Sequence, residues 1–143
     1  MARVSLVLAL LVAGCAARST AKEDRMSAAT QEPEVIDRAG IVEHAGERVR
    51  LVGRYTELDV RMSAPPPPEF RGHVAIVLDD QTAVLLEADW RESAIRLRDE
   101  IERHRERRVA VTGMILPVAP RHPDGANSLA LPCMVEIESV TLR

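Results

Sequence analysis

The sequence predicts a mainly β domain over residues 34–143, with its elements in the order β-β-β-α-β-β. Five segments have the length and apolar pattern of strands, one segment between the third and fourth has an apolar period near 3.6, and glycines interrupt two strands. The chain has 143 residues, of which 46% are hydrophobic and 29% are charged. This length and composition suit the core of one compact domain and exclude a large two-domain enzyme.

The first predicted strand spans residues 48–62 and alternates apolar and polar side chains. Val49, Leu51 and Tyr55 fall on one face, and arginines fall on the other. After Gly53 the alternation resumes in shifted phase. A glycine with a phase shift indicates a bulge, which lets one long strand bend and take part in two sheets.

Four further strands follow from short apolar runs. Residues 73–78 and 83–87 form a predicted hairpin around a turn at 79–81. Residues 109–116 and 134–142 are the fourth and fifth predicted strands. Gly113 interrupts the fourth strand as Gly53 interrupts the first.

One helix is predicted over residues 89–106, between the third and fourth strands. Asp89 and Glu92 have the spacing of a capping box. Its apolar face recurs at steps of four and three, at Trp90, Ala94, Leu97, Ile101 and His104. Arginines at 103, 105, 107 and 108 crowd its end, where the helix dipole favours cations. A patch for anionic lipid or polymer is the alternative interpretation.

The order of three strands, a helix and two strands, with a long bent first strand, resembles the OB-fold. The resemblance covers about residues 46–143 and depends on element order and on Gly53 and Gly113. It implies a small five-stranded OB-like barrel with one helix between strands three and four. Another small β-rich α+β sheet is the alternative.

The sequence also contains an internal echo at a constant offset of 60 positions. The matching residues are Ile41, His44, Arg48, Val49, Leu51 and Gly53 with Ile101, His104, Arg108, Val109, Val111 and Gly113. Both stretches have the pattern of a helix followed by a glycine-bent strand, so Glu34–His44 is predicted to be a short helix that covers the barrel. True repetition and local convergence on one steric demand both explain the echo.

Residues 1–14 have the features of an export signal. Arg3 precedes an apolar run that is about half the roughly 20 residues needed to span a bilayer. The run ends in small residues before Cys15, and here the sequence resembles a bacterial lipoprotein signal peptide. The resemblance implies cleavage before Cys15 and its lipidation with acyl chains such as palmitate, which anchor the protein in the cell envelope. Ala16 is compatible with the periplasmic side of the outer membrane; an ordinary cleaved signal, leaving a periplasmic protein, is the alternative.

Residues 15–33 are then a lipidated cysteine and a flexible tether, because they are rich in Ala, Ser and Thr and lack an apolar period. If Cys15 carries lipid, Cys133 has no intramolecular cysteine partner. It lies in an apolar run, which predicts a buried and unreactive thiol.

Two long connections between strands are the predicted binding region, because OB barrels commonly bind ligands with these loops. The first holds Phe70 and Arg71 after four consecutive prolines, and the second, residues 117–132, holds Arg121, His122 and Asp124. Arginine supplies planar donors and histidine a pH-sensitive group, so the loops suit a small anionic or polar ligand. An exposed loop surface without a ligand is the alternative.

Several function classes do not fit the sequence. The formal net charge is −3 and the chain contains one Trp, one Tyr and one Phe, which disfavours nucleic-acid binding. No phosphate-binding glycine loop, nucleophile elbow, zinc-type spacing or catalytic triad is recognisable, so neither catalysis nor a cofactor is expected. The sequence predicts a lipid-anchored, non-catalytic envelope module that recognises a protein, peptide or envelope glycan. A structural component without a ligand and, more remotely, a nucleic-acid-binding OB domain are the alternatives.

Overall fold

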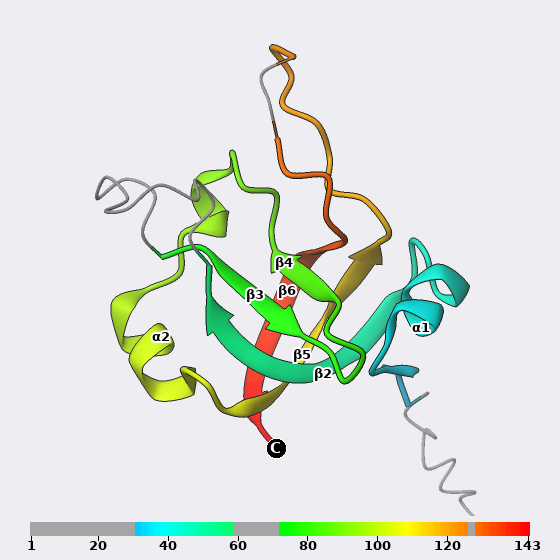
Figure 1. Cartoon of the computed structure of the whole chain (residues 1–143), viewed down its shortest axis with the longest axis vertical. Helices are drawn as coiled ribbons and strands as arrows, with labels where there is room; N and C mark the ends of the chain where they lie inside the picture. Colours follow the sequence, from blue (N-terminus) through cyan, green and yellow to red (C-terminus); the bar gives the residue numbers. More distant parts are fainter. Residues whose placement is uncertain (1–30, 59–71, 126–127) are drawn as a thin grey trace, which may run out of the picture.

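The computed structural model describes residues 31–58, 72–125 and 128–143 of the chain. In this part the protein is mainly β, as predicted, and five strands close into a barrel with short helices outside it (Figure 1). The barrel strands are β2 (Arg48–Glu57), β3 (Val74–Val77), β4 (Ala83–Leu86), β5 (Arg108–Leu116) and β6 (Cys133–Leu142).

The strands are joined in the order β2-β3-β4-β6-β5, and pairing of β5 with β2 closes the ring. β4 and β6 are parallel, whereas the other four pairs are antiparallel. Parallel neighbours require a crossover connection, and the crossover from β4 to β6 contains α2 and β5.

β2 is a strongly curved strand with two neighbours in the barrel, β3 and β5 (Figure 1). Its residues 48–54 pair with β5, and its residues 54–57 pair with β3, in both cases without a register shift. Gly53 lies at the change of partner, where a Cβ atom would stand 2.5 Å from the carbonyl oxygen of Val77. The bend predicted at Gly53 is confirmed, but the bulge is not observed there. Val60 and Met62, the predicted continuation of the strand, lie outside the described residues.

The barrel's bulge is in β6, opposite Gly113. Thr112 pairs with Ser139 and Met114 with Val135, so β6 contains two extra residues between these pairs. Glu136, in the bulge, has a φ of +53°. A Cβ atom on Gly113 would stand 2.8 Å from the carbonyl oxygen of Val135. The second strand glycine is therefore also required by a close backbone approach.

The single helix predicted over 89–106 is wrong in extent. A 3-10 turn, η2 (Glu92–Ala94), and the helix α2 (Arg98–His104) are separated by extended backbone. Ile95 forms an antiparallel bridge with His73, which holds this residue out of a helix. Leu97, predicted to lie on the buried face, is 76% exposed. Tertiary pairing thus overrides the helical period of the sequence.

The helix predicted over Glu34–His44 is confirmed in its second half only. Its first residues form the short strand β1 (Glu34–Val35), which pairs in parallel with β2. α1 (Arg38–Glu43) follows, and the Asp37 side chain caps it by accepting a hydrogen bond from the Gly40 backbone.

The internal echo corresponds to equivalent elements in space. α1 and α2 begin at residues 38 and 98, and β2 and β5 begin at residues 48 and 108. In the antiparallel β2–β5 pair, Leu51 faces Val111, and each glycine faces the matching valine of the other strand: Gly53 with Val109, and Gly113 with Val49. The register is therefore symmetric about the Leu51–Val111 pair, although this symmetry does not distinguish repetition from convergence.

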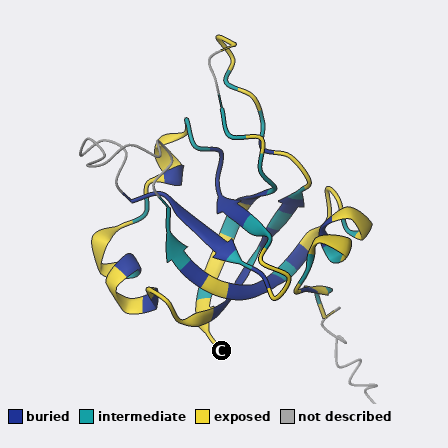
Figure 2. Ribbon diagram, in the orientation of Figure 1, coloured by how far each residue is buried: buried dark blue, intermediate teal, exposed yellow. Residues whose placement is uncertain are grey.

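The core fills the barrel, and buried residues follow the strands (Figure 2). The helices are mostly exposed: α1 buries only Ile41, and α2 buries Ile101 and His104. The main apolar cluster includes Tyr55, Ile76, Leu86 and Ile115, and a second cluster surrounds Cys133 under the loop that follows β5. Cys133 is fully buried, as predicted. Burial raises the pKa of its thiol to about 12, so the reactive thiolate is disfavoured at neutral pH.

Candidate functional site

The long connection from β5 to β6 projects from one end of the barrel (Figure 1). It carries three of the predicted site residues, Arg121, His122 and Asp124. The other two, Phe70 and Arg71, lie outside the described residues, as does Cys15.

Contacts from the loop and from the segment after β4 converge on Trp90 at this end of the barrel. Its indole Nε1 donates a 2.9 Å hydrogen bond to the carbonyl oxygen of Pro120. The ring of His122 meets the indole edge-on, with centroids 5.2 Å apart and an interplanar angle of 74°. The Arg91 guanidinium carbon lies 5.2 Å from the centroid of the same ring. A half-buried aromatic ring thus joins the loop to the segment that follows β4.

Arg91 is held in place by a buried carboxylate. Its Nη1 lies 3.2 Å from Oε2 of Glu87, a residue that is only 7% exposed. The other carboxylate oxygen of Glu87 accepts a 3.1 Å hydrogen bond from the Glu136 backbone N–H. Glu87 therefore fixes both the cation beside Trp90 and the bulge of β6.

Asp89 connects the segment after β4 to two other parts of the chain. Its Oδ2 accepts a 3.3 Å hydrogen bond from the Leu129 backbone N–H, and its carbonyl oxygen lies 2.8 Å from His73 Nε2. Its Oδ1 is buried without a hydrogen-bond partner in the described part of the chain. The capping role predicted for Asp89 is wrong, because η2 is capped at Arg91 and has no side-chain cap.

One of the predicted loop residues, Arg121, lines a hollow beside a local turn. The Asp124 backbone N–H donates a 3.1 Å hydrogen bond to His122 Nδ1, which closes a tight local turn. Beside it is a cavity of about 270 Å³ whose lining includes Val118, Arg121 and Leu129. Arg121 is exposed and forms no ion pair with the described residues. Loop length indicated this region, but the central Trp90 was missed because it was assigned to a helix.

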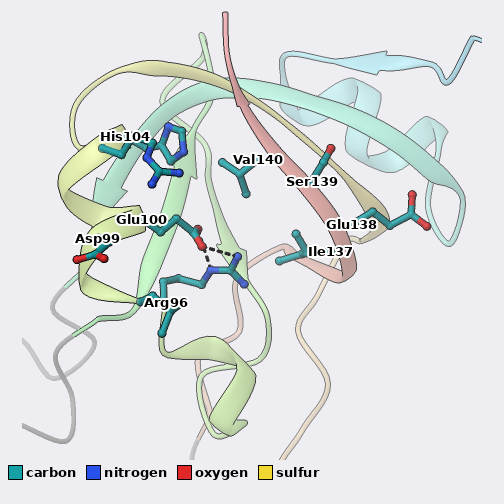
Figure 3. A pocket seen from close by; sticks show the side chains of 10 residues that line it. Arg96, Asp99, Glu100, His104, Ile137, Glu138, Ser139 and Val140 are labelled. Atoms are coloured by element: carbon teal, nitrogen blue, oxygen red, sulfur yellow. Dashed lines mark hydrogen bonds and ion pairs between the residues drawn. The ribbon is translucent and has the colours of Figure 1, made fainter.

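A second polar cluster lies at the base of α2. Arg96 donates two 2.9 Å hydrogen bonds to the Glu100 carboxylate (Figure 3). Tyr55 donates a third hydrogen bond of the same length to this carboxylate. Burial and the Glu100 charge together raise the pKa of Tyr55. His104 packs against Tyr55 with ring centroids 5.6 Å apart, and burial lowers its pKa. A cavity of about 420 Å³ separates this cluster from β6.

Half of the arginine cluster at the end of α2 is neutralised. Arg105 is paired with Glu57, and Arg108 donates hydrogen bonds of 2.6 and 3.0 Å to Asp79. The bond from Arg108 also lowers the pKa of the Asp79 carboxyl. Arg103 and Arg107 are exposed and have no ion-pair partner among residues 31–58, 72–125 and 128–143.

Within the described ranges, no helix has the length and apolar character needed to cross a membrane. Nor do the described side chains include a group of three or more His, Cys, Asp or Glu residues arranged to hold a metal ion. Comparisons with protein-family models, with curated proteins and with solved structures found no match for this chain.

Proposed function

We propose that this protein is a lipid-anchored, non-catalytic binding module of the bacterial cell envelope, built on an OB-fold. The fold proposal is supported by a closed five-stranded barrel with its helix between the third and fourth barrel strands. The bent first strand, which joins the second and fourth barrel strands around Gly53, supports it further.

The membrane anchor is proposed from the sequence around Cys15, which lies outside the described residues. The change Cys15→Ser should release the protein from membranes into the soluble periplasmic fraction, because the acyl chains would be lost. Mass spectrometry of the native protein should find a chain that begins at an acylated Cys15. An uncleaved and unmodified start would refute the anchor.

The binding surface proposed for this module is the Trp90 end of the barrel, and its proposed ligand is an acidic envelope glycan. The observation that carries this proposal is the convergence of Arg91 and the 117–132 loop on Trp90. An indole ring offers a flat apolar face to a sugar, and the exposed Arg121 offers two parallel donors to a carboxylate.

The chain has one tryptophan, so its fluorescence reports directly on this surface. Titration with a uronic-acid oligosaccharide should change the emission saturably, whereas neutral maltohexaose should not. Arg121→Glu should weaken binding about tenfold or more, because it places a carboxylate opposite the ligand's own. The matched control Arg107→Glu reverses an exposed charge in the turn between α2 and β5 and should bind as the wild type does.

Two further assays distinguish the alternative functions: affinity capture from solubilised envelopes and retention on single-stranded DNA. Capture of one stoichiometric envelope protein that Arg121→Glu abolishes would make the partner a protein instead of a glycan. Salt-sensitive retention on single-stranded DNA would favour the nucleic-acid alternative. The absence of any ligand or partner in these assays would leave a structural envelope component.

A further inference from the structure

β6 has an edge that its neighbour β4 leaves open. β4 pairs with β6 only at Leu85–Cys133 and Leu86–Met134. At this point both strands turn apart, since Glu87 has a φ of +72° and Glu136 a φ of +53°. The Glu87 carboxylate takes the Glu136 N–H and so ends the pairing. Beyond it, β6 continues to Leu142 with β5 on one side.

The hydrogen-bonding direction of this edge follows from the register. The Arg143 N–H donates to the carbonyl oxygen of Arg108 in β5. Backbone groups of an antiparallel strand alternate in direction, so residues 141 and 139 also point to β5 and residues 142 and 140 point away from it. The Met134 carbonyl and the Glu136 N–H, at even positions too, both bond to Glu87 on this outer side. Residues 140 and 142 therefore direct their backbone N–H and C=O groups toward the open edge.

The open edge faces the 420 Å³ cavity, whose opposite wall is α2 (Figure 3). Ile137 and Val140 of β6 are half-buried at its floor and pack against the barrel core. Leu97, 76% exposed, lies at its rim. A space of this size beside residues 137–140 holds about three or four residues of extended chain, which rise about 3.3 Å each. It is too small for a folded domain.

Two charges on the α2 wall have no ion-pair partner among the described residues. Arg96 and Glu100 are paired with each other, and Glu138 is paired with Arg48. Asp99 and Arg103 line the cavity, are exposed, and form no ion pair within the described part of the chain. They are four residues apart on a helix, a rise of about 6 Å, which matches the roughly 6.6 Å between alternate residues of a strand.

We infer that the groove between α2 and β6 is a second binding site, which takes an extended peptide segment of a partner protein as an additional strand on β6. Its main chain pairs with residues 140 and 142, and its inward side chains are apolar and cover Ile137 and Val140. Its outward side chains carry opposite charges two residues apart, facing Asp99 and Arg103. This site is separate from the proposed glycan surface and does not depend on it.

The first test is selection of a phage-displayed library of random seven-residue peptides on the purified protein. Enriched peptides should alternate apolar and polar residues, with a basic and an acidic residue two positions apart. They should lose affinity about tenfold or more for Leu97→Asp, which puts a charge in place of the exposed apolar side chain at the rim of the groove, and keep it for the control Glu102→Lys on the outer face of α2. No enrichment, or equal binding to Leu97→Asp, would overturn the site.

The second test separates strand addition from other modes of binding. Backbone N-methylation of the selected peptide should abolish binding when it falls on the alternate residues whose N–H groups pair with β6. It should be tolerated on the residues between them. Tolerance of N-methylation at both sets of alternate residues would refute main-chain pairing. The double change Asp99→Arg with Arg103→Asp should reverse the preferred order of charges in the peptide, and an unchanged order would refute the charge contacts.

A third measurement addresses the competing occupant, a second copy of the chain. Light scattering of the wild type across a range of concentrations should report a monomer that peptide does not alter. A dimer that Leu97→Asp dissociates would assign the edge to self-association and overturn the peptide proposal.

Discussion

The unit formed by α1 and β2 and the unit formed by α2 and β5 share backbone hydrogen bonds position for position. Tyr55 N–H donates to the carbonyl oxygen of Arg107, and Ile115 N–H donates to that of Glu47. The reverse bonds run from the Gly46 and Glu106 N–H groups to the carbonyl oxygens of Ile115 and Tyr55. Each unit therefore closes the end of the other's strand.

The two units differ where their helices begin and end. Asp37 caps α1, whereas the equivalent Leu97 gives α2 no side-chain cap. The turn after α1 uses Gly46 at a φ of +81°, and the turn after α2 holds Glu106 at +57°. The shared apolar and glycine positions set the backbone path, and the residues that differ adjust local stability and environment.

The largest effect on this comparison is expected from the two strand glycines. Gly53→Val and Gly113→Val should each lower the free energy of unfolding by about 3 kcal/mol or more, since the new Cβ atoms would stand 2.5 and 2.8 Å from backbone oxygens that are not free to move. Gly53→Val should be the worse, because its clash is shorter and involves Ile76 as well. Urea denaturation measures both. Variants as stable as the wild type would contradict the close approach of the strands.

Changes at the two helix caps are expected to have smaller effects on stability, of opposite sign in the two units. Asp37→Ala should cost about 1 kcal/mol, because the Gly40 N–H loses its acceptor. Leu97→Ser should instead stabilise the protein by up to about 1 kcal/mol, since it supplies the missing cap and removes a side chain that is 76% exposed. Thermal unfolding of both variants provides the measurement, and shifts of the same sign would refute the contrast.

The strands could be predicted from the sequence because their alternation and their glycines express local steric demands. The strand predicted over 83–87 is observed as Ala83–Leu86, and that over 109–116 as Arg108–Leu116. The helix over 89–106 could not be delimited, because the bridge of Ile95 to His73 depends on a residue 22 positions away. The parallel strand β1 was missed since two residues carry no detectable period.

The candidate surface could be predicted only in part, for a similar reason. The length of the 117–132 connection indicated a binding loop and so gave Arg121, His122 and Asp124. The position of Trp90 beneath that loop results from its bond to Pro120, which no local pattern encodes. The open edge of β6 also required the tertiary register, because it exists only where β4 turns away.

The two equivalent histidines provide a pH test of the comparison. His44 is half-buried with Nδ1 2.9 Å from Glu47 Oε2, whereas His104 is buried against Tyr55 and its pKa is lowered, mainly by burial. The unfolded chain binds a proton at His104 near pH 6.5 and the folded protein resists it, so stability should fall as the pH drops below about 6.5. His104→Phe should remove this contribution to the loss of stability at low pH, whereas His44→Gln should leave it in place. Denaturation curves measured between pH 5 and 8 test this prediction. Parallel profiles of stability against pH for His104→Phe and the wild type would contradict the assignment of this effect to His104.

The smallest expected effect concerns the turn after each helix. Glu106→Gly should stabilise the protein by about 0.5 kcal/mol, because glycine adopts a φ of +57° without the steric cost of a side chain. The change also removes the ion pair with Arg54, but both partners are 51% exposed and such pairs contribute little. Gly46→Ala should act in the opposite direction by about 1 kcal/mol, since it places a side chain at a φ of +81°. If Gly46→Ala were neutral while Glu106→Gly stabilised, the two turns would differ in strain and not merely in residue type, and the symmetry of the units would end at their strands.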